Sequence, residues 1–170
     1  MVIKMKKIPL SKGKFAIVDD DDFEYLSKFK WYYVFKKRSR NGYAVRDFSR
    51  NIEIIKEFGV SHVTMHRFII KPSRNKLVDH VDGDGLDNRK SNLRVCTHTQ
   101  NNGNFLLGSR NRSGYKGVSW HKTTKKWRAS LMTKEKQIYL GLFINPKDAA
   151  AAYNREAIKY FGDFARINQL

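Results

Sequence analysis

The sequence predicts an α+β protein, and three observations support this class. Residues 1–64 form a small β-rich part, in which short alternating apolar runs are separated by turns. Residues 65–104 follow a strand–loop–strand–helix pattern. After a polar, basic linker over residues 105–112, residues 113–170 contain three alternating strands and one helix. We expect that last segment to be a three-stranded antiparallel sheet packed on its helix.

The composition points to a polyanionic partner. Lys and Arg together number 34 against 16 acidic residues, a formal net charge of +18. Solubility alone rarely requires such a surplus, and nucleic acid is the commonest polyanion that proteins bind. Cys96 is the single cysteine, which excludes a disulfide framework and a thiolate zinc site. No apolar run approaches the roughly 20 residues that cross a bilayer, and the first residues lack a secretory signal. We therefore expect a cytoplasmic protein with no membrane partner.

In the amino-terminal part, Asn41-Gly42 is a hairpin signal, and Asp19–Asp22 suggests the cap of a short helix. A metal site at these four carboxylates is the alternative interpretation, and capping explains them better. Basic residues surround the expected hairpin and could lie along a phosphate backbone or simply be solvated; they are Lys36, Lys37, Arg38 and Arg40. His66 lies in an expected short helix that should end before Pro72, and we expect it to be a packed, bracing histidine instead of a ligand.

The stretch 77–104, LVDHVDGDGLDNRKSNLRVCTHTQNNGN, concentrates short polar side chains around a Gly- and Asp-rich loop. Its spacing excludes a calcium-binding EF-hand, because position twelve is Leu93 instead of Glu. Hydrolysis of a phosphodiester needs a positioned water, a base and a cation. A neutral histidine suits the base, and carboxylate and amide oxygens suit Mg²⁺ or Mn²⁺. A purely structural Asp/Asn-rich loop remains the alternative.

This stretch resembles the ββα-metal motif of HNH homing endonucleases, in the phage and intron-type branch where asparagine replaces the last histidine. The resemblance implies that His80 is the general base and that Asn92 braces the loop and orients that base. It also implies that Asp79 and Asn101 hold one Mg²⁺ or Mn²⁺ ion. Because Asn101 stands where many family members have His, a single hard cation is favoured over zinc.

In the carboxy-terminal segment, Asn145-Pro146 should open the helix, with Gly162 as a stop. Val118, Trp120, Trp127 and Ala129 alternate toward that helix, and we expect both tryptophans to be core residues. The opposite face of the sheet should be polar and about the right size for a DNA major groove.

This segment resembles the plant ethylene-response-factor (Apetala-two) DNA-binding domain from about Ser113 to Asn168, through YKGVSW, KWRASL, YLGLF and DAAAAYNREAIKYFG. In that family the sheet reads the major groove. The matching positions are Lys116, Ser119, His121, Arg128, Ser130, Met132, Gln137 and Tyr139. Several plant arginines are absent here, so the target sequence does not carry over.

Together these features predict a site-preferring, metal-dependent endonuclease that nicks or cuts double-stranded DNA, resembling phage- or intron-borne homing endonucleases. We expect a monomer that needs no small-molecule cofactor and acts in the host cell. The alternative is a non-catalytic, sequence-specific DNA-binding regulator. RNA binding is less favoured, because no aromatic-rich strand of the RNA-binding type is present.

Overall fold

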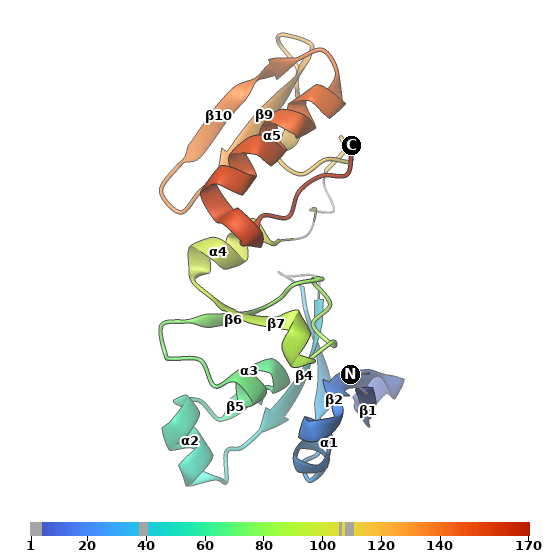
Figure 1. Ribbon diagram of the computed structural model, residues 1–170, viewed down its shortest axis with the longest axis vertical. Helices are drawn as coiled ribbons and strands as arrows, with labels where there is room; N and C mark the ends of the chain where they lie inside the picture. Colours follow the sequence, from blue (N-terminus) through green and yellow to red (C-terminus); the bar gives the residue numbers. More distant parts are fainter. Residues whose placement is uncertain (1–4, 38–40, 106, 108–110) are drawn as a thin grey trace. The chain divides into compact units, whose positions relative to one another are not determined.

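The computed structural model describes residues 5–37, 41–105, 107 and 111–170, and the chain divides into two compact units, Met1–Thr97 and His98–Leu170. Both units mix helices with small antiparallel sheets (Figure 1), so the predicted α+β class is confirmed. None of the helices in the described part of the chain is long and apolar enough to span a membrane.

The first unit is built on three small sheets. Strand β1 (Met5–Pro9) pairs with β2 (Phe15–Asp19), and the next sheet has the order β3 (Tyr32–Lys36), β4 (Asn41–Asp47), β5 (His62–Thr64). The third sheet is the hairpin of β6 (Leu77–His80) and β7 (Leu93–Cys96). The helices are α1 (Asp20–Ser27), α2 (Ile52–Phe58) and α3 (Met65–Ile70), with short 3-10 turns at Ser11–Gly13 and Lys90–Asn92.

An aromatic core holds this unit together. Trp31 and Phe68 are buried, and their ring centroids lie 5.7 Å apart. Phe48 stacks on Phe68 at 5.4 Å, and the indole N–H of Trp31 donates to the Leu26 carbonyl at 3.0 Å. Buried aromatic pairs contribute about 0.5–1.5 kcal/mol each beyond the area that they remove from water. The core therefore fixes α1, α3 and the β3–β4–β5 sheet against one another.

The Asn41-Gly42 prediction was only half right. A hairpin does join β3 and β4, but both residues lie inside β4, where Asn41 pairs with Lys36 and Gly42 with Phe35. The turn itself, with Arg38 and Arg40, lies outside the described residues. The amide of Asn41 binds a loop far along the chain, and a side chain at Gly42 would collide with the ring of Tyr33. Contacts with other segments of the folded unit therefore explain why Asn41 and Gly42 stand at these positions.

The second unit matches its predicted elements closely. Helix α4 (His98–Gly103) is followed by the sheet β8 (Val118–His121), β9 (Lys126–Met132), β10 (Gln137–Phe143), in the order β10-β9-β8. Helix α5 (Pro146–Phe161) packs across one face of this sheet (Figure 1), and a 3-10 turn follows at Gly162–Phe164. Asn145 caps α5 as expected, its side chain accepting from the Lys147 N–H at 2.8 Å.

Trp120 was wrongly expected in the core. It is 49% exposed, although its ring lies 5.1 Å from that of Trp127, which packs against the core. Trp120 belongs to β8, the edge strand, where helix α5 gives less cover. Alternation therefore identified the face on which Trp120 lies, while strand order decided its exposure.

The compact units divide the chain differently from the predicted segments. Residues 1–64 belong to the same unit as the β6–β7 hairpin, because β2 and β4 bind the loop between those strands. The expected linker, residues 105–112, falls within the second unit, and residues 106 and 108–110 lie outside the described part. A separate DNA-docking role for residues 1–64 stays a prediction.

Candidate active site

Strand β6 presents Asp79 and His80 at its end, immediately before the Gly- and Asp-rich loop. Both side chains are buried, with Asp79 7% and His80 5% exposed. Asp79 lies opposite Arg94 and His80 opposite Leu93 in the antiparallel hairpin. Successive strand residues point to opposite faces, so the carboxylate and the imidazole leave the hairpin in different directions.

Asn92 ties the two ends of the loop together. Its carbonyl oxygen accepts from the Asp82 N–H at 3.1 Å, and its amide donates to the Asp82 carboxylate and to the Asp87 carbonyl, both at 2.9 Å. The side chain is only 7% exposed. Three hydrogen bonds of one buried side chain thus hold the loop in place.

The amino-terminal strands hold the outside of the same loop. The Asn41 amide donates to the Gly83 carbonyl, and its oxygen accepts from the Gly85 N–H at 3.2 Å. On the other side, the Ile17 N–H donates to the Leu86 carbonyl at 2.8 Å, and the Asn88 N–H donates back to Ile17 at 2.7 Å. Strands β2 and β4 therefore position the loop, which no local sequence signal indicated.

The acidic run at the start of α1 takes part in this support. The Asp19 carboxylate accepts from the Lys90 backbone N–H, and the Lys90 ammonium pairs with Asp22, each at 2.7 Å. Asp19 does stand at the N-cap of α1 as expected, although its side chain makes no capping hydrogen bond within the described helix. Asp19 and Asp22 therefore hold Lys90.

His80 lies in an enclosed, partly aromatic environment. Its ring is perpendicular to that of His66, with centroids 4.9 Å apart, and Tyr43 lies 6.0 Å away. Burial lowers the pKa of His80, and it outweighs the raising effects of the Asn88 hydrogen bond and of the carboxylates around the loop. His80 is therefore neutral near pH 7, the state that a general base requires.

His66 is packed, as expected. It is 8% exposed, and its Nε2 is hydrogen-bonded to the Thr64 hydroxyl at 2.9 Å. Burial lowers its pKa well below the ordinary value, and interactions with His80, Lys36 and Arg67 lower it further. His66 thus stays neutral beside His80.

Asp79 is paired with a guanidinium that the sequence did not single out. Arg94 donates to the same carboxylate oxygen of Asp79 through Nε at 3.0 Å and Nη2 at 2.8 Å.

The second unit contains Asn101, half-buried on α4. That helix is held by its own unit, because the Arg166 N–H and the Lys116 ammonium both donate to the Gly103 carbonyl.

The donor types fit a hard divalent cation. Carboxylate and amide oxygens are ligands of Mg²⁺ and Mn²⁺, which commonly keep water and substrate phosphate in their remaining positions. The residues that the structure describes contain no group of three or more His, Cys, Asp and Glu side chains that could hold a metal. Asp79 in the first unit and Asn101 in the second each carry an oxygen donor of this type.

The open face of the second unit's sheet follows the predicted alternation. Ser119 pairs with Arg128, Ser130 with Tyr139, and Met132 with Gln137, so these residues share one face. His121 lies at the end of β8, its Nδ1 hydrogen-bonded to the Thr124 hydroxyl at 2.9 Å. Lys116 precedes the sheet, and its ammonium is bound to Gly103. Lys116, a predicted DNA contact, thus also holds the end of α4.

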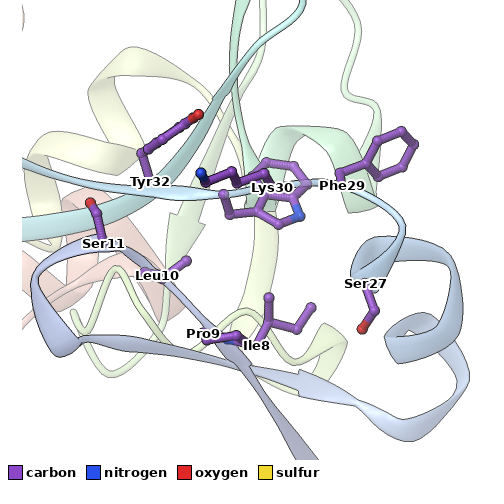
Figure 2. A pocket seen from close by; sticks show the side chains of 9 residues that line it. Ile8, Pro9, Leu10, Ser11, Ser27, Phe29, Lys30 and Tyr32 are labelled. Atoms are coloured by element: carbon purple, nitrogen blue, oxygen red, sulfur yellow. The ribbon is translucent and has the colours of Figure 1, made fainter.

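A cavity of about 460 Å³ lies elsewhere in the first unit, beside β1 (Figure 2). Its walls are mainly apolar, from Ile8, Leu10 and Phe29, with Lys30 and Tyr32 also among the lining residues. Neither Asp79 nor His80 lines it. This hollow is therefore separate from the candidate active site.

Four residues that support the site were missed by sequence reasoning: Asn41, Tyr43, Asn88 and Arg94. Asn88 is fully buried and donates to the Leu86 carbonyl at 3.0 Å. Only Arg94 had a usable signal, because the strand register of a short hairpin places it opposite Asp79.

Comparison with known proteins identifies a nuclease family over the same stretch of the chain. Residues 72–103 match the family model described as HNH endonuclease. The chain is 30% identical over 165 residues to an uncharacterized HNH endonuclease of Acanthamoeba polyphaga mimivirus, covering 94% of this chain and 77% of that protein. No solved structure matches the chain significantly.

Two further relatives match shorter parts. Protein 3.8 of Escherichia phage T7 is 37% identical over 60 residues, which is 35% of this chain and 50% of that protein. APETALA2-like protein 2 of Oryza sativa subsp. indica is 44% identical over 62 residues, 36% of this chain and 14% of that protein. The resemblances to HNH endonucleases and to Apetala-two proteins are thereby confirmed. Since the mimiviral protein is similar along most of both chains, and residues 72–103 match the family model, the chain belongs to the HNH endonuclease family.

Proposed function

We propose that this protein is a site-preferring, metal-dependent endonuclease that hydrolyses phosphodiester bonds of double-stranded DNA. The observation that carries the proposal is His80: a buried, neutral imidazole beside Asp79, next to a loop that Asn92 braces. The net charge of +18 and the similarity to plant APETALA2-like proteins support DNA as the substrate.

His80 accepts the proton of the attacking water. The water oxygen forms a bond to phosphorus, the bond to the leaving oxygen breaks, and that oxygen takes a proton from solvent. The imidazolium formed on His80 is favoured by the Asn88 hydrogen bond and by the charges of Asp82, Asp79 and Asp84. Asn92 keeps the loop that carries Asp82, Asp84 and Asn88 in one conformation.

Asp79 and Asn101 would hold one Mg²⁺ or Mn²⁺ ion, which supplies charge stabilisation for the phosphate and the leaving oxygen. Arg94 neutralises the buried Asp79 carboxylate and fixes its orientation.

DNA selection is the task that we assign to the sheet of the second unit. Its open face carries Ser119, Arg128, Ser130, Met132, Gln137 and Tyr139, and a three-stranded sheet has the size to enter a major groove. We propose that the protein acts as a monomer of the homing-endonuclease type.

The deciding experiment incubates the purified protein with supercoiled plasmid DNA, with and without Mg²⁺, and maps the ends of the products. We expect Mg²⁺-dependent nicking or cutting at preferred positions. His80→Ala should lower the rate by at least about 100-fold while DNA binding persists, since a general base contributes about 10²–10⁴-fold. His62→Ala is the matched control, because His62 is exposed on β5. Cleavage by His80→Ala at the wild-type rate would refute the role of His80.

A further inference from the structure

The β3–β4–β5 sheet has one face in the core and one face toward the active site. Ala44 and Val63 on one side are buried in the aromatic core. On the other side, Tyr43 contacts the His80 ring, and Thr64 binds His66. Asn41 on this second side binds the active-site loop.

The strand register places a second set of residues on that same active-site side. Val34 pairs directly with Tyr43, Lys36 with Asn41, and Tyr32 with Val45, so Tyr32, Val34 and Lys36 extend the surface along the edge strand β3. We name these three residues the β3 row, together with Lys30, which precedes the strand and has its ammonium over the Tyr32 ring. Unlike Tyr43, the members of the row are exposed: Tyr32 is 43% and Val34 39% exposed.

Both lysines of the row are held against aromatic rings. The Lys36 ammonium lies 5.4 Å from the centroid of the Tyr43 ring, and the Lys30 ammonium lies 5.9 Å from that of Tyr32. Cation–π contacts restrict where a flexible lysine places its charge. The Tyr43 ring thus lies close both to the Lys36 ammonium and to the His80 ring.

We infer that the β3 row is a DNA-binding surface, and that the duplex lies against it directly beside the phosphate that is cleaved. The inference depends on the proposed endonuclease function and specifies the substrate contact next to the catalytic base. It does not involve the sheet of the second unit.

The chemistry of the row fits the flank of a cleavage site. A duplex carries one phosphate per about 3.4 Å of axis on each strand, so phosphates next to the reacting one must pass close to His80. Two ammonium groups can bind such phosphates, and Tyr32 and Val34 provide an apolar surface for the deoxyribose faces between them. A row that mixes lysines with exposed apolar side chains and adjoins the catalytic base is thus complementary to a backbone that alternates charge and sugar.

The first test removes the two charges. Lys30→Gln/Lys36→Gln is compared with Lys14→Gln/Lys56→Gln, which has the same net charge and loses two exposed lysines outside the row. Both pairs are made in the active protein and in the His80→Ala protein, so that cleavage and binding are measured separately.

We expect the row variant to raise KM and Kd by at least about tenfold near physiological salt, with kcat at saturating DNA within about threefold of wild type. The salt dependence of log Kd should become shallower by about 1.8, because each phosphate contact contributes about 0.9. The control pair should change Kd and the salt slope much less. Equal effects of the two pairs would overturn the inference.

The second test locates the row on the DNA. Val34→Cys is coupled to a photoactivatable cross-linker, and the cross-linked nucleotides are compared with the cut position. Cys96 does not interfere, because it is buried and its thiol pKa is raised to about 11. Lys56→Cys on α2 is the control, and Tyr32→Cys replaces Val34→Cys if the latter does not fold.

We expect cross-links from the row within about half a helical turn of the cut, and none there from Lys56→Cys. Cross-links far from the cut, or none at all, would overturn the inference even if cleavage is normal. Absence of cleavage by the wild-type protein, or persistence of cleavage in His80→Ala, would instead refute the proposed function.

Discussion

The rings of His66 and His80 meet at an interplanar angle of 89°, with their centroids 4.9 Å apart, and both side chains are buried. His66 is itself fixed by Thr64. The ring of the proposed base therefore rests on a second histidine whose orientation is set by strand β5.

Replacing His66 tests this support. We expect His66→Ala to lower the free energy of unfolding by about 2 kcal/mol, as for a buried cavity, and to slow DNA cleavage about tenfold or more. His66→Phe keeps a ring against His80 and should retain more activity than the alanine variant. Urea denaturation and plasmid nicking at a temperature where both variants are folded provide the measurements. Wild-type cleavage by His66→Ala would show that the contact does not position His80.

The two histidines also predict how stability depends on pH. Burial lowers the pKa of both below the value of about 6.5 in the unfolded chain, so below that pH the unfolded state binds more protons. Stability should therefore fall as pH decreases from about 7 to 5, by at most about 1.4 kcal/mol per pH unit for each histidine. The measurement is the urea midpoint against pH in EDTA. His66→Phe should show a smaller decrease, and a flat profile for the wild type would contradict the argument.

The Arg94–Asp79 pair leads to a prediction about metal. In Arg94→Gln the buried carboxylate loses its guanidinium, and we expect a loss of about 2 kcal/mol in stability. A divalent cation can replace part of that charge, so Mg²⁺ should raise the melting temperature of Arg94→Gln more than that of the wild type. Thermal unfolding with Mg²⁺ and with EDTA measures both. An equal effect of Mg²⁺ on the two proteins would argue against Asp79 as a ligand.

Gly103 at the end of α4 should not accept a side chain. A Cβ there would lie 2.7 Å from Cγ of Phe161 and 2.9 Å from the Phe164 carbonyl oxygen. Gly103→Ala should therefore destabilise the second unit by about 1–3 kcal/mol and reduce cleavage, although no reacting group is changed. Asn102→Ala, at an exposed position of the same helix, is the control. If Gly103→Ala were as stable as Asn102→Ala, the Phe161 ring would be able to move aside.

Arg128 on the open face of the sheet should contribute to DNA affinity. We expect Arg128→Ala to raise Kd about tenfold and to reduce the salt slope by about 0.9, while kcat at saturating DNA stays unchanged. Arg155→Ala, exposed on α5, removes the same charge away from that face and should have less effect. Both variants are titrated with DNA over a range of salt. If they gave the same Kd and the same salt slope, Arg128 would not belong to the binding surface.

Much of the fold could be predicted because the signals were local. The N-cap Asn145 with Pro146 located the start of α5, and alternation separated the two faces of β9. The stretch around His80 and Asn92 was recognisable because the site residues are close in sequence. Trp120 was mistaken because alternation gives the face of a strand and says nothing about whether it lies at the edge of a sheet.

By itself, the sequence determined the α+β class, the basic character of the protein and the residues Asp79, His80, Asn92 and Asn101 as candidates for catalysis. Only the tertiary structure decided what surrounds them: Arg94 on Asp79, His66 and Tyr43 against His80, and Asn41 on the loop. The reason is physical. Strand periodicity and capping act over a few residues, whereas burial, and with it the lowered pKa of His80, depends on side chains from distant segments that pack together only when the chain folds.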